Sequence, residues 1–165
     1  MRYRHVHITR KHASCDPGKA FLWAVMEYDL KNVTGPLGID AACDFFKNRH
    51  MFRTRRYVGV DNNLEALRRG KRRHPDGEGL FVPLENLDLP QCCADAIVSS
   101  HTLQYLKPND QLRVVDMFCR AVVPQGKLLI HVPRTSWLPE IEAALQQHFL
   151  HVDTARIGNL ASRVF

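Results

Sequence analysis

The sequence predicts an α/β fold, a three-layer sandwich in which a mostly parallel, twisted sheet carries helices on both faces. Apolar runs of strand length alternate with longer amphipathic stretches along the chain, and this order favours right-handed crossovers with helices on both sides of the sheet. Two of the runs, residues 37–43 and 56–61, each lead to an aspartate where the strand ends. The final stretch, residues 150–165, predicts two short strands around Gly158-Asn159, with an antiparallel strand at the C-terminus.

Length and composition are those of one domain without a membrane span. A chain of 165 residues is long enough to bury a core of its own, so residues 1–165 are expected to form a single domain. Hydrophobic residues make up 45% and charged residues 24%, which disfavours a disordered or fibrous chain. The apolar runs are too short to span a bilayer, and residues 1–12 lack the apolar stretch of a signal peptide. A cytoplasmic location is therefore expected.

The cysteines and the basic residues narrow the choice of site. Five cysteines form an odd set without Cys-x-x-Cys spacing, and no disulfide framework, zinc ribbon or other metal site is predicted. The net charge of +6 comes largely from two clusters: Arg49, Arg53, Arg55 and Arg56, and then Arg68, Arg69, Lys71, Arg72 and Arg73. Such clusters can attract nucleic acid or another polyanion. A solvated basic helix face is the other interpretation, and the preferred one.

The first part of the chain predicts a basic arm and the start of the α/β alternation. Residues 1–14, with three histidines among arginines and lysines, are expected to form a partly ordered arm. A helix begins at Pro17, with Asp16 as its N-cap, and ends before Gly35. The elements after it are a strand at residues 37–43, a short helix at 45–52 and a strand at 56–61.

The rest of the chain continues the alternation. Asn62 or Asn63 caps a helix that runs to Arg73 and ends at a turn over residues 74–77. The remaining elements are a strand at residues 80–84, a loop at 85–93, a strand at 94–100, a helix at 109–122, a strand at 127–132 and a helix at 139–148. The predicted parallel sheet contains these three strands and the strands at residues 37–43 and 56–61.

The order of these elements and the sequences of several segments resemble the class I S-adenosylmethionine-dependent methyltransferases, which have a Rossmann-like fold. The resemblance runs from about residue 17 to the end of the chain, and its segments are residues 38–44, 57–61, 84–90, 95–106 and 123–130. No single motif is specific, so the order and spacing of the segments carry the resemblance. It implies S-adenosylmethionine as cofactor and transfer of a methyl group to an acceptor that the sequence does not identify.

The resemblance places the cofactor at the ends of the first two strands. Asp61 ends an apolar strand, where its carboxylate can accept hydrogen bonds from two ribose hydroxyls. The alternative for Asp61 is N-capping of the next helix, a role that Asn62 or Asn63 could fill instead. Asp40 would organise the first turn and approach the methionine amino group, or else bond to the backbone of the turn. Ala42 in the first turn and Asn62 after the second strand complete this part of the predicted cofactor site.

Two further groups complete the predicted site. Glu85 and Asn86 follow the third strand, where their side chains could read the adenine edge; an ordinary polar loop is the alternative. Ser99 and Ser100 end the fourth strand, in the region where the resemblance puts the cofactor and the methyl acceptor. His101 follows them as the candidate catalytic base, because imidazole titrates near neutral pH. A helix-capping or surface histidine is the alternative for His101.

The first turn departs from the family pattern, because it has no glycine. Ala42, Asp44 and Phe46 occupy positions where the family has glycines that let the methionine part of the cofactor lie against bare backbone. Asp44 also brings a carboxylate toward the carboxylate of the ligand, a repulsive arrangement unless a basic group such as Lys47 intervenes. We therefore expect reduced affinity for the cofactor. The Asp/Asn-Pro-Pro-aromatic motif of amino-directed nucleic-acid methyltransferases is absent after the fourth strand, so the basic clusters do not identify a nucleic-acid enzyme.

Two functions of different classes follow. The first is a small methyltransferase whose acceptor site is open, or is completed by a partner or by a second copy of the chain in a homo-oligomer. The second is a methyltransferase-like binding or regulatory module that has lost the cofactor and uses its basic surface for a polyanionic partner. A dinucleotide-dependent oxidoreductase is disfavoured, since a pyrophosphate needs closer backbone approach at the first turn than methionine does. The enzyme would be excluded if Phe45 or Phe46 plugged the crevice between the first and fourth strands, with Asp61 turned away.

Overall fold

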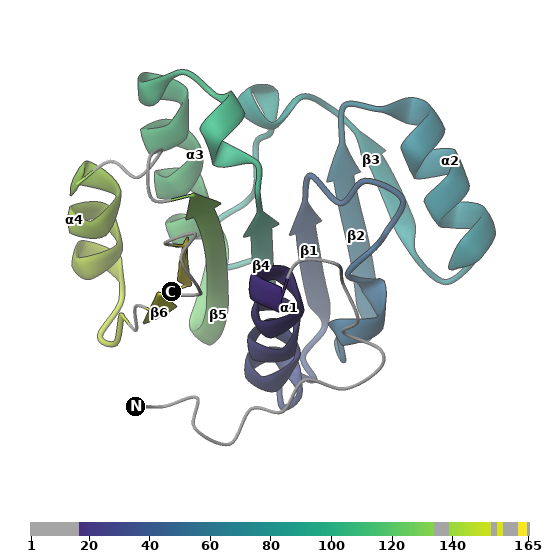
Figure 1. The fold of residues 1–165 in the computed structure, drawn as a ribbon, viewed down its shortest axis with the longest axis horizontal. Coiled ribbons are helices and arrows are strands. Elements are labelled where there is room, and N and C mark those ends of the chain that lie inside the picture. Colours follow the sequence, from purple (N-terminus) through teal and green to yellow (C-terminus); the bar gives the residue numbers. More distant parts are fainter. Residues whose placement is uncertain (1–16, 134–138, 153–154, 157–161, 165) are drawn as a thin grey trace.

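The computed structural model describes residues 17–133, 139–152, 155–156 and 162–164. The predicted basic arm, the proposed cap Asp16 and the turn at Gly158-Asn159 lie outside these residues. Within them, the strands form one 7-stranded sheet in the order β3-β2-β1-β4-β5-β7-β6 (Figure 1). None of the helices in these ranges combines the length and the apolar character that a membrane crossing requires.

Parallel strands supply the framework of the sheet. They are β1 (Leu37–Ala41), β2 (Arg56–Asp61), β3 (Glu78–Phe81), β4 (Ala94–Ser100) and β5 (Val122–Pro133). The short strands β6 (Ala155–Arg156) and β7 (Ser162–Val164) pair antiparallel with each other, and β7 pairs antiparallel with β5. Because β1 lies between β2 and β4, the strand order reverses there, and a ligand crevice is expected at the carboxyl ends of these strands.

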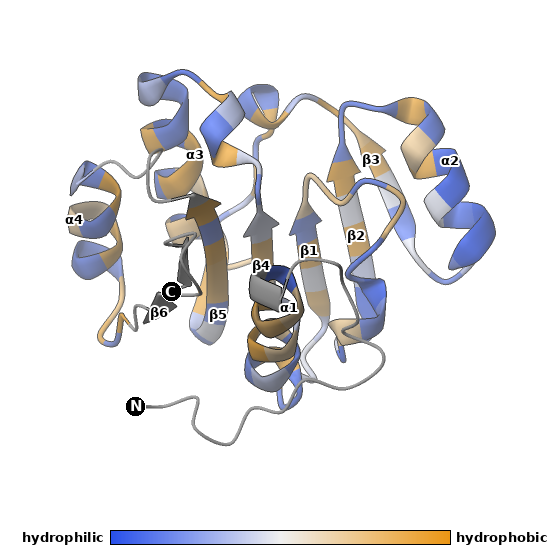
Figure 2. Ribbon diagram, in the orientation of Figure 1, coloured by the Kyte–Doolittle hydropathy of each residue, from blue (hydrophilic) through white to orange (hydrophobic). Residues whose placement is uncertain are grey.

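Helices cover both faces of the sheet. α1 (Pro17–Leu30) and α2 (Leu64–Arg73) pack on one face, and α3 (Pro108–Ala121) and α4 (Pro139–His148) pack on the other. Figure 2 shows hydrophobic residues along the strands and on α1, whereas α2 is largely hydrophilic. Only Ala66, Leu67 and Gly70 of α2 are buried, so this helix turns a narrow stripe to the sheet and its basic side to solvent.

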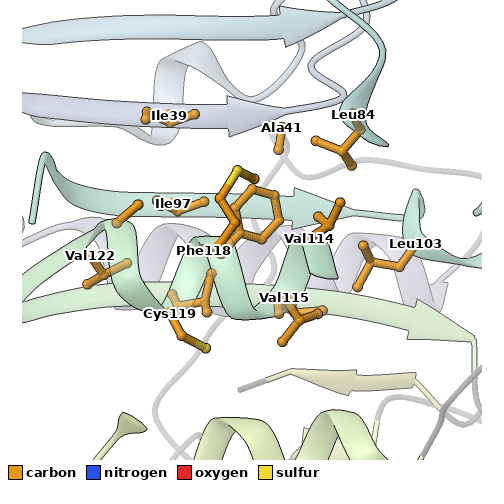
Figure 3. Packing of buried hydrophobic residues seen from close by; sticks show 14 of the residues in the cluster. Ile39, Ala41, Leu84, Ile97, Leu103, Val114, Val115, Phe118, Cys119 and Val122 are labelled. Atoms are coloured by element: carbon orange, nitrogen blue, oxygen red, sulfur yellow. The ribbon is translucent and has the colours of Figure 1, made fainter. Parts of the chain in front are cut away.

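The larger core lies between the sheet and α3 (Figure 3). Val114, Val115 and Phe118 of α3 recur at helical spacing and pack in one cluster with Ile39 of β1 and Ile97 of β4. All five side chains are at most 2% exposed. Burial of a side chain of this size stabilises the fold by about 1.5–3 kcal/mol, so α3 fixes the relative position of the two strands that flank the crevice.

The second core lies under α1 and contains a group of three aromatic rings. Leu22 and Met26 of α1 are buried in the same cluster as Phe46, Phe52 and Tyr57. The Tyr57 ring meets Phe46 at a centroid distance of 5.3 Å and Phe52 at 5.0 Å, both in edge-to-face geometry. Such pairs add about 0.5–1.5 kcal/mol beyond the area that they bury. The segment between β1 and β2 is therefore anchored by its aromatic side chains.

Most of the predicted elements are confirmed, and β2, β4 and α4 have the predicted bounds. The third strand is displaced from the predicted residues 80–84 and ends at Phe81, because Pro83 has no N–H to donate to the ladder. The fifth strand starts at Val122 rather than at residue 127, across a register shift between Ala94 and Ala96 of β4.

The predicted helix at residues 45–52 is wrong. Residues 44–48 form turns, and only the short 3-10 helix η2 (Arg49–Met51) follows. Phe46 has a φ of 61°, a left-handed conformation that a right-handed helix cannot contain. Its ring is fully buried, so tertiary packing decides the local structure in place of the helical pattern.

Candidate functional site

The candidate site lies at the carboxyl ends of β1, β2 and β4, where the strand order reverses. β1 pairs with β2 along one side and with β4 along the other, with Ala41 aligned to Val60 and to Ser99. The first turn after β1, the carboxylate of Asp61 and the end of β4 therefore meet at one edge of the sheet. Two of the three, the turn and Asp61, are joined by a direct hydrogen bond.

The first turn keeps a glycine-type backbone although it has no glycine. Ala42, Asp44 and Phe46 have φ values of 63°, 53° and 61°, so every second residue is left-handed. An L-residue in this conformation costs about 1–2 kcal/mol. The backbone N–H groups of Ala42 and Cys43 both donate to the carbonyl oxygen of Val60, at 2.8 and 3.0 Å, and hold the turn over the end of β2.

The carboxylate of Asp61 is directed to this turn. Its Oδ2 accepts a hydrogen bond from the backbone N–H of Asp44 at 2.8 Å, and its Oδ1 accepts one from Asn63 N–H at 2.9 Å. Asn63 caps α2 through its own side chain, which accepts from Ala66 N–H at 3.1 Å. Because an ionised carboxylate has about four acceptor positions, both Asp61 oxygens retain capacity for ligand hydroxyls. Asn62, the neighbouring predicted residue, is exposed beside this carboxylate.

Phe46 is packed beneath α2. A Cβ on Gly59 of β2 would lie 2.6 Å from its ring, one on Gly70 of α2 would lie 2.7 Å away, and one on Gly77 would lie 2.9 Å away. Glycine at these three positions thus leaves space for the Phe46 ring, which lies between β2 and α2. The condition that would have excluded the enzyme is not met, since Phe46 points under α2 and Asp61 faces the turn.

Phe45 also lies toward α2. The guanidinium carbons of Arg69 and Arg73 are 5.2 and 5.7 Å from the centroid of its ring, in cation–π geometry. Such contacts are worth about 0.5–1 kcal/mol at exposed sites. Phe45 therefore uses the basic side of α2 as its contact surface and packs away from β4.

Asp40 is buried in a hydrogen-bond network below the turn. Its Oδ2 accepts from the Tyr57 hydroxyl at 2.8 Å, and its Oδ1 accepts from the Asn48 amide at 3.2 Å. Burial raises the pKa of Asp40 from 3.8 to about 6, while the hydrogen bonds from Tyr57 and Asn48 oppose that rise. The predicted alternative partner, the backbone of the turn itself, is replaced by these two side chains. Asp40 thus fixes the start of the turn from beneath.

The ends of β4 and β5 bring two histidines together. His101 follows β4 with a φ of 59°, and its ring centroid is 3.9 Å from that of His131 on β5. The backbone N–H of His101 donates to the carbonyl oxygen of His131 at 3.0 Å, and the Ser100 hydroxyl lies 3.1 Å from Nδ1 of His101. Ser99 and Ser100 are both buried beside this pair. The structure thus joins predicted residues Ser100 and His101 directly.

His131 was not predicted from the sequence. It is a polar residue near the end of the apolar fifth strand, and the register aligns it with Ser100. Burial lowers its pKa to about 3, with smaller contributions from His101 and Lys19, so the ring is neutral at physiological pH. Within the described part of the chain, Nδ1 of His131 and the hydroxyl oxygen of Ser99 are buried without a hydrogen-bond partner.

Glu85 and Asn86 lie on the short 3-10 helix η3 (Leu84–Asn86), which follows β3. The carbonyl oxygen of Glu85 accepts a hydrogen bond from Arg113 of α3, while Asn86 is exposed. Leu87, which follows them, is 4% exposed and belongs to the α3 core. Within the part of the chain that the structure describes, no hydrogen bond or ion pair joins Glu85 or Asn86 to Asp61 or the first turn, so their role in binding adenine stays a prediction.

The basic clusters are partly neutralised within the molecule. Arg49 pairs with Asp76, Arg56 pairs with Glu78 at 2.9 Å, and Arg72 pairs with Glu65 at 3.0 Å. Weaker pairs join Arg53 to Glu27 and Arg68 to Glu65. Lys71 donates to the carbonyl oxygens of Pro75 and Gly77 after α2. These contacts agree with a solvated helix face, the preferred interpretation of the sequence.

A cleft of about 970 Å³ lies at the opposite edge of the sheet. Its walls come from the start of β5, the end of α4 and the residues that follow α4. A smaller, narrow void lies under α1, with Ser99, Ser100 and His131 in its lining. The candidate site is therefore defined by its strand ends and hydrogen bonds, and it lies apart from the cleft at the start of β5.

A family model described as a methyltransferase domain matches residues 38–130, from the start of β1 to the middle of β5. The match covers more than half of the chain. The chain belongs to the methyltransferase domain family. All the segments that carried the resemblance lie within these residues, and the predicted family and Rossmann-like fold are confirmed.

Solved structures agree with this family. The N-methyltransferase NodS from Bradyrhizobium japonicum matches over 92% of this methyltransferase and 96% of its own length, with 13% identity and a TM-score of 0.77. The same protein in complex with S-adenosyl-l-homocysteine matches with 15% identity and a TM-score of 0.75, over 94% of this chain and 92% of its own. At these identities the likeness shows the fold.

Two further structures extend the comparison. A TehB-like methyltransferase from Corynebacterium glutamicum matches with 15% identity and a TM-score of 0.66, over 84% of both chains. A methyltransferase from Mesorhizobium loti matches with 22% identity and a TM-score of 0.58, over 67% of this chain and 53% of its own. This chain therefore spans about half of the Mesorhizobium loti protein. No curated protein sequence matches it. The ligand in the NodS complex is S-adenosyl-l-homocysteine, and the family match gives this chain a methyltransferase domain.

Proposed function

We propose that the chain transfers the methyl group of S-adenosylmethionine to an acceptor that approaches the end of β4. The observation that carries this proposal is the position of the Asp61 carboxylate at the end of β2, where it faces the first turn. Asn63 caps α2, so Asp61 is not the helix cap. When bound, S-adenosylmethionine supplies an electrophilic methyl group on a sulfonium. The protein has mainly to bind, orient and exclude water around it.

The residues at the ribose end fit an adenosyl ligand. Asp61 would accept the ribose hydroxyls through charge-assisted hydrogen bonds, with Asn62 at its side. Asp40 supports the first turn from below through Tyr57 and Asn48. Ala42 retains the left-handed backbone that a glycine would adopt, with only one methyl group added. Glu85 and Asn86 would border the adenine.

The acceptor end has the groups that a proton-bearing nucleophile needs. His101 would accept the proton that an attacking oxygen or nitrogen loses, and Ser100, 3.1 Å away, would orient its ring. Ser99 lies one residue before them, with a hydroxyl that has no partner among the described residues. The class of acceptor that these groups favour is therefore one whose attacking atom must be deprotonated.

The alternative function is a binding or regulatory module with a polyanionic partner. The ion pairs within the basic clusters weaken this alternative, because the paired arginines would have to exchange partners to bind a polyanion. Residues Arg69 and Arg73, stacked on Phe45, would be the first contacts for such a partner. Completion of the acceptor site by a second copy of the chain and a cytoplasmic location stay predictions from the sequence.

Titration calorimetry tests the proposed function. We expect the wild-type chain to bind S-adenosylmethionine and S-adenosylhomocysteine, and an Asp61→Asn variant to lose at least about tenfold in affinity, since a charged hydrogen bond is worth about 1.5–3 kcal/mol. Glu140→Gln is the matched control, because Glu140 is an exposed carboxylate on α4, outside the predicted site. Failure of the wild-type chain to bind either ligand at millimolar concentration would overturn the enzyme and leave the binding module.

A further inference from the structure

Asp44 lies beside the carboxylate that is proposed to hold the ribose. Its backbone N–H donates to Oδ2 of Asp61 at 2.8 Å, and its φ of 53° places it in the left-handed part of the first turn. Its side chain is half-buried, and no ion pair joins it to another residue in the described ranges. A half-buried carboxylate without an ion pair among the described residues thus belongs to the residue that is hydrogen-bonded to Asp61.

Charges of both signs surround this turn. Asp40, Asp44 and Asp61 occur within one turn and the end of the adjacent strand, and Lys47 acts on the buried Asp40. Arg69 and Arg73 of α2 lie on the ring of Phe45, the neighbour of Asp44. The cations of α2 therefore meet the turn at Phe45, whereas the turn meets Asp61 through Asp44.

A ligand with its ribose on Asp61 must pass this turn to reach the end of β4. The chain beyond the ribose in S-adenosylmethionine carries a sulfonium, an ammonium and a carboxylate. Methyl transfer converts the sulfonium into a neutral thioether, so S-adenosylhomocysteine has one positive charge fewer. Unit charges at contact distance in a partly buried site interact strongly enough to change affinity by an order of magnitude.

We propose that Asp44 selects adenosyl ligands by the charge of their chain, favouring cationic groups and disfavouring a carboxylate. This inference rests on the proposed function, because it takes Asp61 as the ribose ligand. The expected order of affinity is decarboxylated S-adenosylmethionine, then S-adenosylmethionine, then S-adenosylhomocysteine. The product is held less tightly than the cofactor, which promotes its release after transfer.

The test compares four ligands on the wild-type chain and on Asp44→Asn by titration calorimetry: S-adenosylmethionine, S-adenosylhomocysteine, decarboxylated S-adenosylmethionine and 5′-methylthioadenosine. Asparagine has the shape of aspartate and also tolerates the left-handed conformation, so the variant is expected to fold. We expect D44N to bind S-adenosylhomocysteine about tenfold more tightly and decarboxylated S-adenosylmethionine more weakly. Its affinity for 5′-methylthioadenosine, which lacks both charged groups, should change less than about twofold.

Ala42→Gly is the control for backbone effects, because it alters the turn without changing its charge and should shift all four affinities by the same factor. Equal shifts for all four ligands in D44N, or an unchanged affinity for S-adenosylhomocysteine, would overturn charge selection while leaving the methyltransferase intact. Absence of binding by every ligand to both proteins would overturn the proposed function and this inference together. Thermal unfolding of each variant checks the fold, and Asp44→Ser provides a second uncharged side chain.

Discussion

The two sides of the crevice differ in how their polar groups are satisfied. On the cofactor side, the oxygens of Asp40 accept from Tyr57 and Asn48, and those of Asp61 accept from two backbone amides. On the acceptor side, Ser99 and His131 each have a buried polar atom without a partner among the described residues. Hydrogen bonds within the protein thus organise the cofactor side, whereas on the acceptor side two buried polar atoms lack a hydrogen-bond partner among the described residues.

This difference predicts that the two sides of the crevice contribute differently to the stability of the fold. A buried polar group without a partner costs about 1–3 kcal/mol, so the histidine pair weakens the fold at a place where a substrate would approach. The cofactor side also contains strained backbone, but aromatic packing and hydrogen bonds offset it. We expect substitutions that remove packing on the cofactor side to lower stability, and apolar substitutions on the acceptor side to preserve or raise it.

The largest effect is expected from loss of the Phe46 ring. Phe46→Ala should lower the free energy of unfolding by about 3–5 kcal/mol, because a fully buried ring leaves a cavity between β2 and α2. Denaturant unfolding measures the change. Phe45→Ala is the control, since Phe45 is half-buried and lies on the arginines of α2. Equal losses in the two variants would show that Phe46 does not anchor the turn.

The next effect is a dependence of stability on pH through Asp40. Its folded pKa of about 6 is above the ordinary value of 3.8, so its contribution to stability is full below pH 4 and is lost as the pH rises through 6. The loss amounts to about 3 kcal/mol. Asp40→Asn should remove it, with the Asn48 amide turned to accept a hydrogen bond.

Denaturant unfolding of the wild type and D40N between pH 4 and pH 8 measures this dependence. The difference between the two proteins should favour D40N progressively as the pH rises. Parallel stability curves across that interval would contradict burial of an ionisable Asp40.

A smaller effect tests the space that surrounds Phe46. Gly70→Ala should destabilise the wild type by about 1–3 kcal/mol, because the new Cβ would lie 2.7 Å from the ring. In the Phe46→Ala background the same substitution should cost less, because the ring is gone and only the backbone carbon of Phe45, 2.9 Å from the new Cβ, still crowds it. A smaller loss in that background, measured by denaturant unfolding, is the expected result. Additive effects would mean that Gly70 does not accommodate the ring.

A substitution on the acceptor side is expected to have the smallest effect, and this effect is a gain in stability. His131→Phe keeps a ring against His101 and removes the buried Nδ1, so stability should rise by about 1 kcal/mol. Thermal unfolding at pH 7.5 measures the gain, with His148→Phe on the surface of α4 as the control. A loss of more than about 2 kcal/mol would show that the His131 side chain supports the fold.

Sequence patterns predict the sheet better than the site. The apolar runs and caps identify β2, β4 and α4 with their bounds, and Asn63 caps α2 as one of two candidates. The segment between β1 and β2 could not be predicted, because the buried position of Phe46 depends on glycines that are distant in sequence. His131 was missed for a similar reason: it lies on a predicted strand, but its alignment with Ser100 is set by a register shift between strands.

The ring of Phe46 and the glycines around it also constrain how the chain can change by mutation. Replacing Phe46 alone with glycine would open a void walled by β2 and α2, and enlarging Gly59 or Gly70 first would drive a methyl group into the ring. Each single step toward a glycine-rich turn therefore passes through a less stable protein. A glycine-rich turn would therefore require coordinated substitutions in several elements. The effect of a substitution at Phe46 depends on the residues at positions 59 and 70, which is epistasis.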